Sequence, residues 1–73
     1  MERALLFRSV REVIAAERLL SERGLHPVAI AVPRSLSSEC GVCLRISDDE
    51  AARADALLDE ERFSHVCARF CED

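Results

Sequence analysis

Apolar residues recur with two different periods in the first third of the chain. Residues 4–7 form a short apolar run that is typical of a buried strand. Apolar side chains at positions 10, 13, 14, 16, 19 and 20 then form the stripe of an amphipathic helix. Ser9 and Glu12 have the spacing of a capping box, and Gly24 stands where a left-handed C-cap is expected. The pattern therefore predicts a strand followed by a helix that begins at about Val10.

The middle of the chain consists of two apolar runs around a polar segment. Residues 28–32 follow Pro27 and alternate bulky residues with alanine, as in a strand. Residues 33–41 are polar and turn-forming, and residues 42–46 alternate again. Val42, Leu44 and Ile46 share one face of this strand, and Cys43 lies on the other. We expect two strands joined by a loop.

The last third repeats the strand and helix order of the first. Ser47 and Glu50 have capping-box spacing, and positions 51, 54, 57 and 58 form a second helical stripe. Residues 63–71 fit either a helix or a strand, and we predict a strand because it fills an otherwise empty sheet edge. The predicted fold class is α+β, a ferredoxin-like βαββαβ sandwich with a four-stranded antiparallel sheet and two helices on one face. We expect residues 1–73 to form a single domain.

Size and charge exclude some functions. With 73 residues, the core is near the lower limit for independent stability, so a homodimer or a bound metal would be expected to help. The net charge of -4 and the scattered arginines argue against a nucleic-acid partner. The N-terminal apolar run is too short for a membrane span or a signal sequence. We expect a cytoplasmic protein without a membrane partner.

The four cysteines are the candidate chemistry. In a reducing compartment, they point to reactive thiols or metal ligands before disulfides. Cys40 would be presented by the loop, with Arg34 and Arg45 favouring its thiolate and Gly41 leaving the approach open. The alternative for Cys40 is a small buried residue at the start of a strand.

Cys40 and Cys43 also form a C-x-x-C pair, and two further interpretations stay open. A thiol-disulfide oxidoreductase would need a turn at Gly41 to bring the two sulfurs together. A small dimeric metal- or ligand-binding module would bind zinc or an iron-sulfur cluster through Cys40, Cys43, Cys67 and Cys71, with His65 as a substitute ligand. His65 is otherwise expected to be an ordinary exposed strand residue.

Four segments give the chain a resemblance to a known family. They are Phe7-x-Ser9, Ala16-Glu17-x-Leu19-Leu20, Val32-Pro33-Arg34 and Ser37-Ser38-x-Cys40-Gly41-x-x-Leu44-Arg45. With these segments, the chain resembles the selenium/sulfur carrier protein-like family, a group of small bacterial and archaeal domains. The last segment is the most specific.

The resemblance implies that Cys40 carries sulfur or selenium as a persulfide-type adduct, with Ser38 and Gly41 in its motif. A donor enzyme and an acceptor protein would be its partners, and the chain itself would be a carrier more than an enzyme, without a cofactor. Cys43 departs from the family pattern, and it would be a possible resolving thiol. Cys67 and Cys71 have no counterpart in the family.

Overall fold

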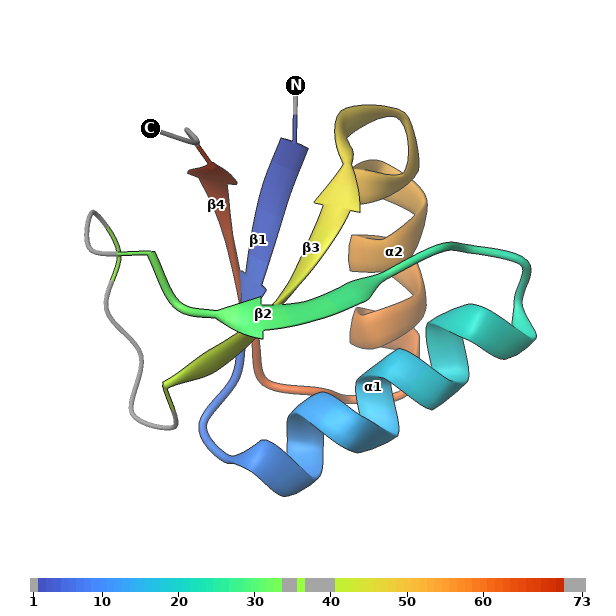
Figure 1. Cartoon of the computed structure of the whole chain (residues 1–73). Coiled ribbons are helices and arrows are strands. Elements are labelled where there is room, and N and C mark those ends of the chain that lie inside the picture. Colours follow the sequence, from blue (N-terminus) through green and yellow to red (C-terminus); the bar gives the residue numbers. More distant parts are fainter. Residues whose placement is uncertain (1, 34–35, 37–40, 71–73) are drawn as a thin grey trace.

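The chain alternates strands and helices in the predicted order. The computed structural model describes residues 2–33, 36 and 41–70. Its elements are β1 (Glu2–Leu6), α1 (Val10–Glu22), β2 (Val28–Ala31), β3 (Val42–Ser47), α2 (Asp48–Glu60) and β4 (Val66–Phe70). Figure 1 shows this βαββαβ arrangement, in which the ambiguous last segment is a strand.

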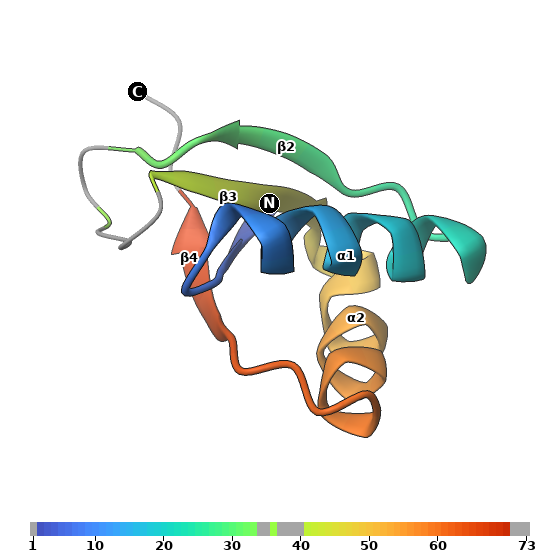
Figure 2. The same cartoon turned by 90° about the horizontal axis from the view of Figure 1, so that it is seen from below.

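The four strands form one antiparallel sheet in the order β2-β3-β1-β4. Leu5 in β1 lies opposite Leu44 on one side and Cys67 on the other, while Leu6 lies opposite Cys43 and Val66. Because successive residues of a strand point to opposite faces, Leu5, Leu44 and Cys67 share one face of the sheet. Both helices lie on that face (Figures 1 and 2), which confirms the ferredoxin-like prediction.

The hydrophobic core lies between this sheet face and the helices. Leu5, Leu44 and Ile46 are at most 1% exposed and pack against the helices. The buried residues that complete the core are Phe7, Val13, Ala16, Leu20, Leu25, Ala51, Ala54 and Leu58. Full burial of each large aliphatic side chain contributes about 1.5–3 kcal/mol, and here such residues supply most of the packing.

The two helix starts differ although their sequences look alike. The Ser9 hydroxyl accepts a hydrogen bond from the Glu12 amide at 3.2 Å, which confirms the first cap. At α2, Ser47 occupies the cap position but its side chain makes no capping hydrogen bond, so that part of the prediction is wrong. The acidic residues of the first turn still lie favourably at the positive end of the helix. Gly24 has φ +85°, as the predicted end of α1 requires.

The predicted stripe of α1 is wider than the surface that the helix buries. Val13, Ala16 and Leu20 are buried, but Val10 is 46% exposed and Ile14 is 61% exposed. The helical period identifies a side of the helix, whereas the width of the buried surface depends on how closely the sheet and α2 approach it.

Candidate functional site

The segment that carries Cys40 connects β2 to β3 at one end of the sheet. The Val32 amide donates to the Gly41 carbonyl at 3.1 Å, which holds the two ends of the segment together. Within the segment, the Leu36 amide donates to the Pro33 carbonyl at 3.0 Å. The prediction of a loop between two strands is confirmed at these described residues. Cys40, Arg34 and Ser38 themselves lie outside the residues that the structure describes.

Gly41 supplies the bend directly after Cys40. Its φ is +74°, in the left-handed region that glycine adopts without steric cost. This backbone conformation allows the chain to bend at Gly41, while the C-x-x-C pairing itself involves Cys40, which lies outside the described residues. Two residues later, Cys43 lies opposite Leu6, at the end of the sheet where β1 stops and β4 starts.

Cys43 lies on the sheet face that points away from the helices. It pairs with Leu6 on one side and Ile30 on the other, and its exposed fraction is 0%. The sequence placed it correctly opposite the bulky face of its strand. A resolving thiol must reach the adduct that it resolves, and full burial disfavours this role for Cys43.

Arg45 is on the same face as Cys43 and pairs with a carboxylate. Its Nε lies 3.2 Å from Glu2 Oε2. An acidic side chain of β1 is thus one partner of the Arg45 guanidinium. Such a pair offsets the positive charge that was expected to favour a nearby thiolate.

Cys67 lies at the opposite face, beside α2. Cys67 is exposed, and together with Arg3, Asp48 and Asp55 it lines a cavity of about 330 Å³. Partial burial raises the pKa of the Cys67 thiol, the carboxylates of Asp55 and Asp48 raise it further, and Arg3 acts in the opposite direction. The thiol is therefore protonated at neutral pH, which makes it a poor nucleophile.

The placement of these two cysteines bears on the metal interpretation. Cys43 and Cys67 are on strands separated by β1 and on opposite faces of the sheet. One ion could not contact both without rearrangement of the sheet. In addition, β4 ends with Phe70 opposite Glu2, at the end of β1 that is remote from Cys43. The positions of Cys43 and Cys67 therefore disfavour the four-cysteine set, whose other members, Cys40 and Cys71, lie outside the described residues.

His65 was predicted to be an ordinary exposed strand residue, and this prediction is wrong. It directly precedes β4, and its side chain is only 4% exposed. The ring nitrogen Nδ1 lies 3.0 Å from the Phe63 carbonyl oxygen, and Nε2 contacts the Asp55 carboxylate. The Phe63 carbonyl only accepts, and so does Asp55 when it is ionised; with an ionised Asp55, both ring nitrogens donate and the ring is an imidazolium.

The electrostatics of His65 agree with this protonation. Burial lowers the pKa of the ring, but the hydrogen bonds to Phe63 and Asp55 and the nearby charges of Asp55 and Asp59 outweigh it, so the pKa is raised. Ligand atoms of Asp55, Asp59 and His65 lie within 4.8 Å of one another, a spacing that could also suit a metal ion. The acids are one helical turn apart, and that spacing was the sequence signal for this group.

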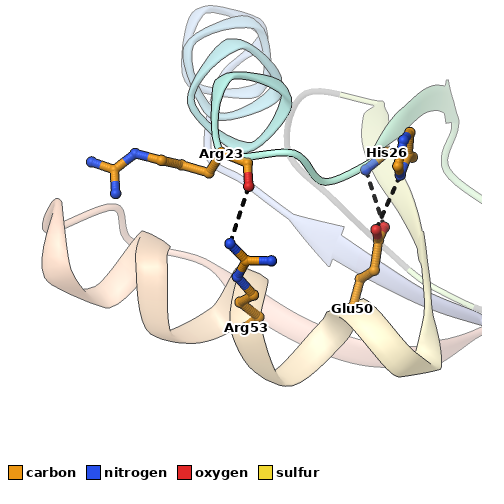
Figure 3. A network of polar contacts seen from close by, with 4 residues as sticks. All are labelled: Arg23, His26, Glu50 and Arg53. Carbon is orange, nitrogen blue, oxygen red and sulfur yellow. Dashed lines mark hydrogen bonds and ion pairs between the residues drawn. The ribbon is translucent and has the colours of Figure 1, made fainter.

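A second polar group joins the end of α1 to α2 (Figure 3). Glu50 accepts hydrogen bonds from the His26 amide at 3.0 Å and lies 3.1 Å from the His26 ring. Arg53 donates to the Arg23 carbonyl at 3.2 Å. These hydrogen bonds from His26 lower the pKa of the Glu50 carboxyl. The contacts position the connection between α1 and β2, and Glu50 makes them instead of completing a capping box.

The fold and the loop define a class of protein: a small α+β domain with a ferredoxin-like sheet and a cysteine-bearing connection at one end of it. The chain belongs to a family described as "putative Se/S carrier protein-like", whose model matches residues 2–65. No curated protein and no solved structure matches the chain. Among the described residues, neither helix is long and apolar enough to cross a membrane.

Proposed function

We propose that this protein carries sulfur or selenium between a donor enzyme and an acceptor protein, with Cys40 as the acceptor thiol. The proposal is supported by the family to which the chain belongs, taken together with the burial of Cys43. The matched range contains Cys40 and Cys43 and ends before Cys67 and Cys71. Since Cys43 is 0% exposed, Cys40 is the thiol within the family range that is left for exchange with another protein.

The transfer is an exchange between sulfur atoms. The Cys40 thiolate attacks the outer sulfur of a persulfide on the donor enzyme, and the sulfur–sulfur bond of the donor breaks. The donor leaves as a thiolate, and Cys40 becomes the persulfide. The proton of the Cys40 thiol goes to solvent, and no external oxidant or reductant is consumed. The same exchange with an acceptor thiol returns Cys40 to its starting state.

The surroundings of the other described thiol support this assignment. Cys67 has a raised pKa, and two acidic side chains lie beside it. It therefore lacks the low pKa that a reactive cysteine needs. We place the transfer in the reducing cytoplasm, where thiols are kept available for exchange.

Intact-protein mass spectrometry tests the proposal. The wild type, Cys40→Ser and Cys67→Ser are each incubated with a cysteine desulfurase and cysteine. We expect one added sulfur on the wild type and on Cys67→Ser, and none on Cys40→Ser. Cys67→Ser is the matched control because it removes an exposed thiol outside the family range. Equal sulfur addition to Cys40→Ser would overturn the role of Cys40.

Metal analysis of the same preparations tests the alternative. Zinc or iron at one equivalent in the wild type, without sulfur addition, would contradict the carrier function and favour a metal-binding module. Rapid formation of a bond between Cys40 and Cys43 under mild oxidation would favour the thiol oxidoreductase. The burial of Cys43 leads us to expect neither outcome.

A further inference from the structure

The sheet is apolar on both faces, although helices cover one. An antiparallel sheet commonly packs one face on the core and presents polar side chains on the other. Here Ile30, Cys43, Leu6 and Val66 lie side by side and form an apolar row across all four strands. The next row on the same face contains Val28, Arg45, Ala4 and Ala68. These eight residues are called the open face below.

The open face has a buried centre and an exposed rim. Ala4 and Cys43 are each 0% exposed, yet neither belongs to the core that the helices cover. On the flanking strands, Val28 is 45% exposed and Val66 is 60% exposed. Figure 2 shows that both helices lie on the other side of the sheet. The face therefore resembles half of a core, with large apolar side chains left at its margin.

The charge of the open face indicates what covers it. Arg45 is the only charged residue of the eight, and its ion pair with Glu2 neutralises it. Together with Glu2, these eight described residues are therefore neutral in sum, whereas the chain as a whole has a net charge of -4. Among these eight described residues, a strongly charged partner would find no unpaired countercharge. A second copy would meet a neutral apolar surface without like-charge repulsion.

We propose that two copies of this protein associate through the open face and pack sheet against sheet. In a symmetric dimer, both copies contribute the same surface patch to the interface, so the patch must be complementary to itself. The apolar row satisfies this condition. Each Glu2–Arg45 pair also carries one charge of each sign, so it can lie against the same pair of the other copy.

The area of the face sets the expected strength of the dimer. Four strands about 4.8 Å apart and five residues of about 3.3 Å each give a face of about 320 Å². Stable interfaces bury about 800 Å² per partner, so the dimer should be weak and reversible. Its existence does not depend on Cys40 or on the carrier function.

The other exposed apolar surface is less suited to a second copy. On α1, Ile14 lies in a groove of about 410 Å³ that is also lined by Ala15, Arg11 and Arg18. Two copies meeting there would bring like charges together. Ile14 is 61% exposed, about as much as Val66, and so it offers a matched control.

Sedimentation velocity over a range of concentrations, up to about 1 mM, tests the dimer. The average mass of the wild type should rise toward that of two chains. Val66→Asp and Val28→Asp should each weaken the dimer at least about ten-fold, because each places a charge in an apolar interface. Ile14→Asp should associate like the wild type. Circular dichroism checks that each variant is folded. We expect all three variants to fold, because the substituted positions are exposed.

Three outcomes would overturn the proposal: a wild type that stays monomeric throughout, open-face variants that associate like the wild type, or an Ile14→Asp variant that dissociates as they do. Sulfur loading of Val66→Asp separates this proposal from the carrier function. A monomeric Val66→Asp that still accepts sulfur on Cys40 supports a dimer that is independent of transfer. If Cys40 accepts no sulfur in either state, the carrier function fails while the sedimentation result stands.

Discussion

The two faces of the sheet bury apolar side chains in different ways. On the helix side, Leu5, Leu44 and Ile46 are large and almost fully buried under two helices. On the open face, the fully buried residues are the small Ala4 and Cys43, and the bulky valines of the outer strands remain exposed. Complete burial of a residue therefore does not by itself identify the main core. The exposure of its larger neighbours distinguishes the open face from the helix-covered face.

The largest expected change in stability comes from comparing Leu44 with Cys43, adjacent residues of β3 that point to opposite faces of the sheet. Leu44→Ala should lower the free energy of unfolding by about 2–5 kcal/mol, because it leaves a cavity under the helices. Cys43→Ala removes one sulfur atom on the open face and should cost about 1 kcal/mol. Urea denaturation of dilute monomeric protein measures both. Equal losses would show that the two faces contribute alike.

Local signals predicted most of the fold. The Ser9 cap, Gly24 and the alternation along β3 depend on residues within a few positions, so the sequence displays them directly. A strand over residues 63–71 was predicted from the need to fill a sheet edge, which follows from the fold as a whole, and the structure has it at Val66–Phe70. By contrast, the exposure of Ile14 depends on the approach of distant elements. No local pattern encodes that distance.

The candidate site was predictable to a smaller extent. The loop between β2 and β3 follows from its polar composition, and the position of Cys43 follows from the period of two. The burial of His65 depends on Asp55, ten residues earlier on another element, and on the turn that contains Phe63. Likewise, Glu50 contacts His26 and not Ser47 because the fold brings the end of α1 beside α2.

A change in stability of intermediate size is expected from the titration of His65, at the polar margin of the helix-covered face. His65 has a raised pKa in the folded state, so its contribution to stability is fully present below its ordinary pKa, near 6.5, and is lost as the pH rises through the raised value. The free energy of unfolding should fall across this window by at most about 1.4 kcal/mol per pH unit for one proton. His65→Gln keeps a donor but does not titrate, and should remove this slope. An unchanged slope in that variant would assign the titration to another group.

The smallest expected effect is on the alkylation rates of the two described thiols, Cys43 and Cys67, which lie on opposite faces of the sheet. In native protein, iodoacetamide should modify Cys67 slowly at neutral pH and leave Cys43 intact, and both should react in urea. Because burial and the Asp55 carboxylate raise the pKa of Cys67, Asp55→Asn should speed its alkylation a few-fold. Glu60→Gln, which changes an exposed acid at the end of α2, should not. Peptide mapping separates the sites. Fast alkylation of native Cys43 would mean that the open face exchanges readily with solvent, and Cys43 would then regain its place as a candidate resolving thiol for Cys40.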